Sequence, residues 1–571
     1  MEYLKIYKEW LSNPYFDEAT KRELEALKGN NKEIKERFFK DLEFGTGGLR
    51  GILGAGINRM NIYTIRRATQ GLANYIIKQK GENRGVVIAY DSRRMSPEFA
   101  METALCMCAN NIKAYLFDSL RPTPELSFAV RELGCMAGIV ITASHNPAEY
   151  NGYKVYWEDG AQITSPKDVE IIHEVNSIKD FSLAKTMDRR EAEDKGLFKI
   201  IGKDIDDKYI ENLKRLVINP VSEEGKGLNI VYTPLNGSGN LPVRRILKEL
   251  GFKNVYVVEE QEYPDSEFTT VGYPNPEDPK VYSLAIELAN KVSGDIILAT
   301  DPDADRLGVR VRDKKGEFVL FNGNMTGALI AEYVFSQLEE KGTLPKNSAL
   351  IKTIVSGNLT DQIAKAYNAQ LIEVLTGFKY IGEKIKEFEE TGSNEFVFGY
   401  EESYGCLVGT HSRDKDAVVA VMTLCEAAAY YKSKGISLYE QMERIFTKYG
   451  YYKELTTSVT LKGIEGIEKI KQIMEGYRKN PPKVAGGNKV LKCRDYLIDT
   501  ITDTKTGEIT PTGLPKSDVL YYEMENDAWC AIRPSGTEPK IKFYFGVKGD
   551  SGEDASKRLD LLMNDKVFKV D

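Results

Sequence analysis

Short β-branched runs alternate with longer amphipathic stretches over most of this chain. Runs such as GVVIAY (85–90), GIVITA (138–143) and DIILAT (295–300) have the length and composition of buried strands. Strands that alternate with helical stretches are typical of α/β sheets. The first ~40 residues instead predict helices with solvated, alternately charged faces and no chemistry.

Polar loops follow these apolar runs. Five of the loops begin at Asp91, Ser144, Leu235, Asp301 and Glu401. Because the ligands of open α/β sheets bind beyond the carboxyl ends of the strands, the loops predict several sheets grouped around one cleft.

The length of 571 residues exceeds what a single hydrophobic core supports, so we expect several domains. Residues 217–229 and 313–318 are interpreted as segments that separate domains. The pattern of predicted helices and strands changes again near residues 447–459. These edges predict four domains, at 1–217, 218–317, 318–447 and 448–571.

Composition and charge indicate a globular protein and argue against some other classes. Apolar residues make up 42% and charged residues 29%, as in globular proteins. The net charge of -7 argues against nucleic-acid binding, and no run approaches the ~20 apolar residues of a membrane span. No secretory signal is visible, and seven unevenly spaced cysteines indicate reduced thiols, so we expect a cytoplasmic protein.

The segment ITASHNPAEYNGYKVY (141–156) places Ser144 where a predicted strand ends. The following Asn146-Pro147 holds the loop away from helix, so Ser144 can be raised as a phosphoryl acceptor. Lys154 follows a glycine turn, so its positive charge is predicted to lie near the same loop. A plain polar turn is the alternative interpretation.

Asp301, Asp303 and Asp305 alternate on one tight loop, DPDADR. Three carboxylates facing one point suit a hard cation such as Mg²⁺, whereas without a cation they would repel one another. Arg306 and Arg312 stand at the sixth and twelfth loop positions, which excludes an EF-hand. A solvated acidic turn remains the alternative.

Two further segments suit a phosphorylated sugar. FGYEESYG (398–405) offers carboxylates and glycines for sugar hydroxyls, and HSRDKDA (411–417) adds cations downstream. AIRPSGTEPKIKFY (531–544) places an arginine, hydroxyls and backbone N–H groups together, as in a phosphate cradle. Both segments, and the weaker LEFGTGGLRGILG (42–54) and LTGFKYIG (375–382), can also be simple turns.

Taken together, these segments resemble the α-D-phosphohexomutase family of phosphoglucomutases and phosphomannomutases. T-A-S-H-N-P is similar to that family's phosphoserine loop, D-P-D-A-D-R to its metal loop, G-Y-E-E-S-Y-G to its sugar loop and R-P-S-G-T-E-P to its phosphate-binding loop. The four motifs occur in the same order as in the family, and the resemblance covers the chain from about residue 40 to 545. It implies an α/β fold of four domains around a central cleft, three with mixed sheets and a C-terminal α+β domain.

The resemblance also implies roles for individual residues. The residues expected near the transferring phosphate are Ser144, Arg50, His145, Lys154 and Lys415. One Mg²⁺ per chain would be held by Ser144, Asp301, Asp303 and Asp305. The sugar would contact Arg306, Thr376, Gly377, Glu401 and Ser403, and the non-reacting phosphate Arg533, Ser535, Gly536, Thr537 and Lys542.

The implied activity is interconversion of glucose 1-phosphate and glucose 6-phosphate, through a phosphoserine and a glucose 1,6-bisphosphate intermediate that also activates the enzyme. Mannose and pentose phosphates are alternative substrates, and a binding protein without turnover is the alternative class. Two departures from the family pattern affect details: Gly47 where members often have serine, and Lys542 where some have arginine. Oligomeric state is not indicated by the sequence.

Overall fold

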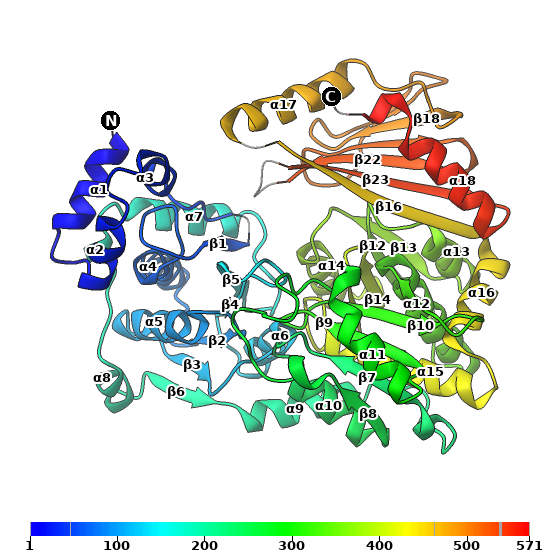
Figure 1. The fold of residues 1–571 in the computed structure, drawn as a ribbon, viewed down its shortest axis with the longest axis horizontal. Coiled ribbons are helices and arrows are strands. Elements are labelled where there is room, and N and C mark those ends of the chain that lie inside the picture. Colours follow the sequence, from blue (N-terminus) through cyan, green and yellow to red (C-terminus); the bar gives the residue numbers. More distant parts are fainter. Residues whose placement is uncertain (1, 46, 462, 536–539, 570–571) are drawn as a thin grey trace. The chain divides into compact units, whose positions relative to one another are not determined.

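The structure is a computed structural model that describes residues 2–45, 47–461, 463–535 and 540–569 (Figure 1). The chain divides into two compact units, which are treated separately below. The first unit comprises residues 1–320, 381–392 and 405–434, and the second comprises 321–380, 393–404 and 435–571.

The first unit begins with three short helices that form their own aromatic core. They are α1 (Glu2–Ser12), α2 (Glu18–Glu25) and α3 (Asn31–Phe38). Trp10 stacks on Phe16 with ring centroids 4.0 Å apart and meets Phe38 edge-on. Asp17 caps α2 by accepting a hydrogen bond from the Thr20 amide. The prediction of helices here is confirmed.

A six-stranded mixed sheet follows, in the order β1-β5-β4-β2-β3-β6. Its strands are β1 (Gly48–Ile52), β2 (Val86–Tyr90), β3 (Ala114–Phe117), β4 (Ala137–Ile141), β5 (Tyr150–Trp157) and β6 (Phe198–Ile201). β2 pairs parallel with β3 and β4, whereas β5 is antiparallel to β1 and β4. Both faces of β4 are buried, which explains its unbroken apolar run.

Helices cover the first sheet on both faces (Figure 1). They are α4 (Ile62–Lys78), α5 (Ser96–Ala109), α6 (Thr123–Glu132), α7 (Lys167–Ser177), α8 (Arg189–Asp194) and α9 (Lys203–Lys214). Cys106 and Cys108 lie buried in α5, and Cys108 packs in the main core of this sheet, so the interpretation of this pair as core packing is confirmed.

The second sheet has the order β11-β10-β9-β7-β8. It comprises β7 (Asn229–Thr233), β8 (Asn254–Val257), β9 (Ile296–Thr300), β10 (Leu307–Arg312) and β11 (Phe318–Phe321), with helices α10 (Asn240–Glu249) and α11 (Ser283–Lys291). Residues 313–318, predicted from sequence to separate two domains, form the turn between β10 and β11. The Asp313 amide donates to the Glu317 carbonyl at 2.8 Å and Gly316 adopts φ 83°, so this sheet continues past residue 317.

The remaining segments of the first unit contain most of α14 (Lys379–Thr391), β15 (Gly405–Val408) and α15 (Ala417–Ser433). In the second unit, β12 (Ser348–Thr353) pairs parallel with β13 (Gln370–Val374) and β14 (Glu395–Glu401). Helices α12 (Gly323–Glu340), α13 (Leu359–Ala366) and α16 (Leu438–Tyr449) accompany these strands. The structure therefore contains a third α/β sheet.

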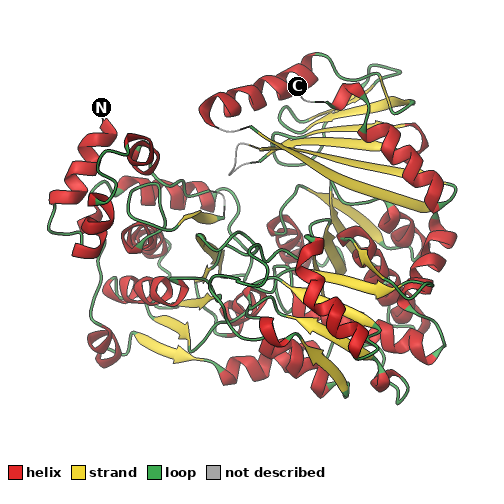
Figure 2. Ribbon diagram, viewed as in Figure 1, coloured by secondary structure: helices red, strands yellow, loops and turns green. Residues whose placement is uncertain are grey.

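A last, largely antiparallel sheet completes the second unit (Figure 2). Its strands are β16 (Tyr451–Thr460), β17 (Val484–Ala485), β18 (Asn488–Asp495), β19 (Thr500–Asp503), β20 (Ile509–Thr510), β21 (Leu520–Met524), β22 (Trp529–Pro534) and β23 (Lys540–Gly549). Helices α17 (Gly463–Lys479) and α18 (Gly552–Met563) contribute Met474 and Leu562 to its core. The expected α+β C-terminal domain is confirmed, whereas the exact domain boundaries stay predictions.

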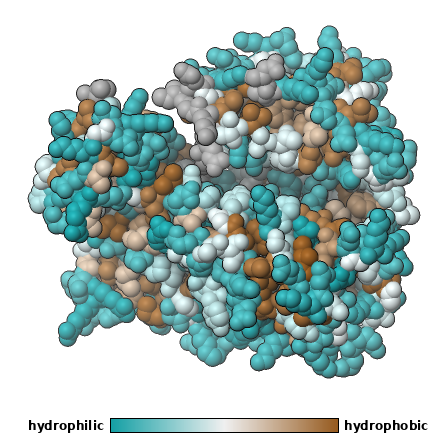
Figure 3. Space-filling model, in the orientation of Figure 1, coloured by the Kyte–Doolittle hydropathy of each residue, from teal (hydrophilic) through white to brown (hydrophobic). Residues whose placement is uncertain are grey.

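Hydrophilic side chains cover much of the visible face, with hydrophobic ones scattered among them (Figure 3). Over the described part of the chain, no helix combines the length and apolar character needed to cross a bilayer.

Candidate active site

Ser144 lies on the loop between β4 and β5, buried to 3% exposure. Its hydroxyl donates to the Asp301 carboxylate at 2.7 Å, and its amide donates to the Thr142 hydroxyl at 2.7 Å. Its φ of 51° is left-handed, a conformation that costs a non-glycine residue about 1–3 kcal/mol. Strain of this size, held by tertiary contacts, is typical of functional loops.

A residue to which the sequence assigned no role holds this loop in place. The buried Arg93 guanidinium donates to the carbonyls of Ser144 at 2.5 Å, Pro147 at 2.8 Å and Tyr150 at 3.2 Å, and also to that of Asn146. Arg93 thereby fixes the backbone that carries Ser144.

Asp91, at the end of β2, completes this anchor. Its carboxylate lies 3.3 Å from the Arg93 guanidinium and accepts from the Thr142 hydroxyl at 2.6 Å and the Ser96 hydroxyl at 2.8 Å. The sequence marked Asp91 only as the start of a polar loop. Its partners lie up to 51 residues away, so only the folded chain shows the network.

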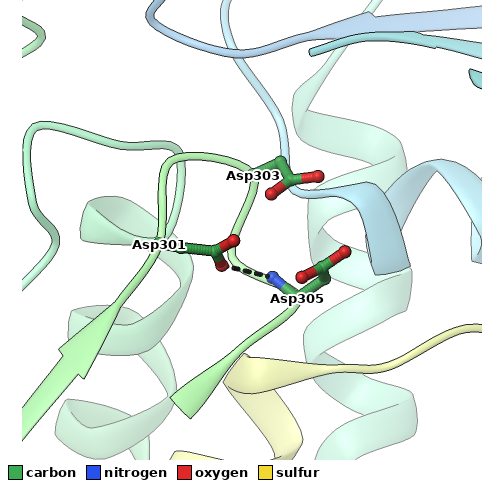
Figure 4. A group of neighbouring side chains, drawn as sticks. All are labelled: Asp301, Asp303 and Asp305. Carbon is green, nitrogen blue, oxygen red and sulfur yellow. Dashed lines mark hydrogen bonds between the residues drawn. The ribbon is translucent and has the colours of Figure 1, made fainter. Parts of the chain in front are cut away.

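The three aspartates of the β9–β10 loop turn their carboxylates toward one point (Figure 4). One oxygen from each lies within 4.8 Å of the others, and all three residues are buried. The loop is tightened by the amides of Asp305 and Arg306, which donate to Asp301 at 3.1 and 3.0 Å. Thr123 donates to Asp303 at 3.0 Å.

This group has the chemistry of a site for a hard cation. One oxygen each of Asp303 and Asp305 is buried without a hydrogen-bond partner among the described residues, which leaves electron pairs for an ion. Burial, together with Asp305 and Asp303, raises the pKa of Asp301 well above its usual range. The three convergent carboxylates, with unpartnered oxygens on two of them, therefore fit a divalent ion.

Two lysines approach the triad from different loops. The Lys154 ammonium lies 2.7 Å from Asp303 and 3.3 Å from Asp305, and that of Lys415 lies 3.2 Å from Asp305. Burial opposes charge on Lys154, but the two aspartates outweigh it and raise the pKa of Lys154. Burial likewise acts to raise the pKa of Asp305, but Lys415 and Lys154 hold it below normal. The structure thus brings both lysines, which are predicted to lie near the transferring phosphate, to the aspartate triad.

Three further residues predicted for this site lie in the same unit. The half-buried His145 has its Nδ1 3.3 Å from the Ser144 hydroxyl, and desolvation followed by the charges of Arg306 and Arg50 lowers its pKa. Arg50 is exposed and approaches the Asn146 side chain at 3.4 Å. Arg306 donates to Glu277 at 2.7 Å, so it is already paired.

The predicted sugar-binding residues lie in loops of the second unit. The Gly377 amide donates to the buried Glu401 carboxylate at 2.9 Å, which joins the loops after β13 and β14. The hydroxyl of Thr376 is buried and has no hydrogen-bond partner among the described residues. The side chain of Ser403, two residues after Glu401, is half-buried. These residues bring a carboxylate and hydroxyl groups together, which are groups that can bind sugar hydroxyls.

The predicted phosphate-binding residues also lie in the second unit. Arg533 and Lys542 are directly opposite on β22 and β23, and the Ser535 amide donates to the Lys540 carbonyl at 2.7 Å. Gly536 and Thr537 lie outside the described residues. Arg533 and Lys542 therefore place two positive charges side by side, a pair called the cationic edge below, and such a pair suits a phosphate.

Glu402 is the second of the two carboxylates that FGYEESYG offers for sugar hydroxyls, but it is not among the residues predicted individually. It accepts from the Thr353 hydroxyl at 3.1 Å. Burial raises its pKa, and the charges of Lys542 and Arg533 act in the opposite direction. The carboxylate thus lies within electrostatic reach of the cationic edge, and it electrostatically links the predicted sugar and phosphate loops within this unit.

Comparison with known proteins places these observations in a family. Residues 41–181, 207–316 and 322–449 match the alpha/beta/alpha domains I, II and III of phosphoglucomutase/phosphomannomutase. A phosphoglucomutase of Staphylococcus epidermidis is 38% identical over 94% of this chain and 96% of its own length. One from Staphylococcus aureus is 37% identical over 93% and 94%.

Solved structures agree on the fold. Parafusin, a phosphoglucomutase from Paramecium, has a TM-score of 0.68 at 17% identity, over 91% of this chain and 94% of its own. A phosphoglucomutase/phosphomannomutase family protein from Burkholderia thailandensis has a TM-score of 0.64 at 20% identity, over 90% and 95%. With three matched domains and relatives similar over nearly its whole length, the chain belongs to the phosphoglucomutase/phosphomannomutase family.

Proposed function

We propose that this protein interconverts glucose 1-phosphate and glucose 6-phosphate, with Ser144 as the phosphoryl carrier. The observation that carries the proposal is the 2.7 Å contact between the Ser144 hydroxyl and Asp301, at the edge of a buried carboxylate triad. The similarity to phosphoglucomutases over 94% of the chain supports glucose as the sugar.

The reaction begins with phosphoserine 144 and a hexose monophosphate. The bond between the serine oxygen and phosphorus breaks, and a bond from phosphorus to the free sugar hydroxyl forms, which gives glucose 1,6-bisphosphate. After the bisphosphate turns around, its other phosphate returns to Ser144. The same intermediate, supplied from solution, would rephosphorylate an empty serine and so act as an activator.

Asp301, Asp303 and Asp305 would hold one Mg²⁺ together with an oxygen of the serine phosphate. The bound ion supplies positive charge where negative charge develops on the transferring phosphoryl group. Arg50 and His145 lie around the same loop and would orient that group.

A proton leaves the attacking hydroxyl and one is needed when the phosphate returns. Lys154 and Lys415 are the two candidates for this transfer, because both ammonium groups lie within 3.3 Å of the triad. Turnover measured against pH for Lys154→Met and Lys415→Met separates them, since only loss of the transferring group removes a limb of the profile.

The remaining predicted residues would hold the sugar and its other phosphate. Thr376, Gly377, Glu401, Ser403 and Arg306 would bind sugar hydroxyls or fix the sugar's orientation. Arg533, Ser535, Gly536, Thr537 and Lys542 would bind the phosphate that does not react. The buried, unpartnered Thr376 hydroxyl and the Arg533–Lys542 pair support this division.

The proposal is tested by phosphopeptide mass spectrometry and turnover. The purified protein is expected to carry phosphate on Ser144, and Ser144→Ala is expected to lose turnover while still binding glucose 6-phosphate. Ser92→Ala is the matched control, because it removes a nearby hydroxyl that has no partner among the described residues. Full mutase activity in Ser144→Ala refutes the scheme. Turnover on glucose, mannose and ribose 1-phosphates identifies the preferred sugar.

A further inference from the structure

A second cavity in the first unit lies among residues to which no role is assigned above. Its volume is about 420 Å³, within the range of small-molecule sites. The C-terminal ends of α6 and α9 line it, through Arg131, Asn212 and Arg215, together with Thr410 and His411 of the segment that follows β15.

The charge around this cavity is positive in excess. Arg131 shares the carboxylate of Glu389 with Arg413, so the two guanidinium groups divide one ion-pair partner between them. Glu132, which also lines the cavity, is neutralised by Lys208 at 2.6 Å. The Arg215 guanidinium has no hydrogen-bond or ionic partner within the described ranges.

The arginines are not engaged in capping their own helices. Arg131 lies in the last turn of α6, but its guanidinium donates to the carbonyls of Thr410 at 2.5 Å and His411 at 3.3 Å. No hydrogen bond in the described structure joins Arg215 to the last carbonyls of α9. Their positions are therefore not explained by stabilisation of a helix terminus.

His411 adds a polar group to the cavity wall. Its side chain is 3% exposed, its Nε2 lies 2.6 Å from Asp416, and its Nδ1 is buried without a partner among the described residues. A buried polar atom of this kind needs a partner from outside the protein or an ordered water.

From these contacts we infer that the cavity binds a small phosphorylated metabolite, independently of the proposed active site. Two guanidinium groups and an amide form the donor set that recognises a phosphate dianion, the His411 imidazole lies beside them in the wall, and the volume leaves room for a small organic body. We further infer that the ligand's presence reaches the active site through residues 409–416.

The route to the active site is short and continuous. Arg131 holds the carbonyls at 410 and 411, and the Arg413 amide donates to the Ser127 hydroxyl at 2.9 Å. The next residues are Asp414, whose carboxylate accepts from the Tyr156 hydroxyl at 2.6 Å, and Lys415, 3.2 Å from Asp305. A ligand that pulls Arg131 toward the cavity therefore acts on the segment that positions Lys415.

The chain's three histidines make the test direct, because His145 reports the active site, His411 the cavity and the exposed His173 neither. The full-length protein is labelled with ¹³C,¹⁵N-histidine, and its imidazole signals are assigned with His145→Gln and His173→Gln. Inorganic phosphate is titrated in at constant pH and ionic strength, with acetate as the comparison anion. The His411 signal is expected to shift saturably with phosphate and not with acetate.

Arg215→Met is the decisive variant, because this side chain has no partner in the described structure whose loss would disturb the fold. It is expected to weaken phosphate binding at His411 about tenfold, the effect of one charge-assisted hydrogen bond. Arg190→Met, an exposed arginine on α8, is expected to bind as the unaltered protein does. An unmoved His411 signal, or equal binding in Arg215→Met, overturns the site and leaves the mutase proposal intact.

The transmitted effect has its own measurement. Mutase turnover with saturating sugar phosphate is followed as glycerol 3-phosphate, which is not a hexose phosphate, is added. Turnover of the unaltered protein is expected to change with this ester, whereas that of Arg215→Met is expected to change only at about tenfold higher concentration. Identical dependence in both proteins refutes transmission through residues 409–416.

Discussion

Replacing Arg93 by methionine tests the idea that one buried side chain holds the reactive loop. Methionine fills similar space but donates no hydrogen bonds, so four carbonyls of the loop lose their donor and Asp91 loses its cation. Removal of one partner from a buried ion pair costs about 3–5 kcal/mol. We expect a loss of stability of that size, to which the unpaired carbonyls contribute.

Turnover is expected to fall further than stability alone explains. Ser144 keeps its left-handed backbone only while the loop is held, and a displacement of about 1 Å at a reacting group costs roughly 10²-fold in rate. Arg93→Lys restores the charge opposite Asp91 but lacks the planar fork. It is expected to recover part of the stability and little of the turnover.

Arg94→Met is the matched control for this experiment. Arg94 adjoins Arg93, but its guanidinium is half exposed and pairs only with the exposed Glu267. Its loss is expected to cost no more than about 1 kcal/mol. Stability is measured as the midpoint of urea unfolding, since a chain of several domains does not unfold in two states. If Arg93→Met matches Arg94→Met in both midpoint and turnover, the anchoring role is wrong.

Three further predictions concern the metal, pH and backbone geometry. Mg²⁺ is expected to raise the thermal midpoint of the unaltered protein and restore turnover after chelation, whereas Asp303→Asn should lose most of both responses. Desolvation raises the pKa of Glu454 from 4.5 to about 7, so the folded state holds a proton that the unfolded chain releases, and urea midpoints should fall as pH rises through this window. Glu454→Gln should remove most of that fall in the midpoint, and the exposed Glu475→Gln none. Gly48→Ala should destabilise the first sheet severely, because Gly48 has φ 134° and the added carbon would lie 1.8 Å from a backbone oxygen. Gly29→Ala is the control: Gly29 has φ 93° but open space around it, so the change should cost only about 1–2 kcal/mol.

The sequence was sufficient for the parts of the site that lie in single loops. Ser144 and the aspartate triad each follow a strand whose apolar run is unbroken, so strand ends and loop chemistry could both be read along the chain. Lys154 was also predicted, because a glycine turn returns β5 toward the same loop.

The anchor and the second cavity could not be predicted in this way. Arg93 holds the loop through main-chain carbonyls, which carry no signature in the sequence, and Arg131 contacts carbonyls some 280 residues away. The local structure of residues 313–318, which are expected to separate two domains, could not be predicted for a related reason. A charged, glycine-containing segment suits a linker and a hairpin turn equally, and the pairing of β10 with β11 shows a turn.

Because Arg93 recognises the loop through its carbonyls alone, the anchor is indifferent to which side chains the loop carries. Ala148 and the exposed Glu149 lie between two of the gripped carbonyls, yet their side chains take no part in the grip. The loop can therefore vary at these positions during evolution, or be randomised in a library, without releasing the serine. The arrangement separates the residues that can tune selectivity from those that keep the fold.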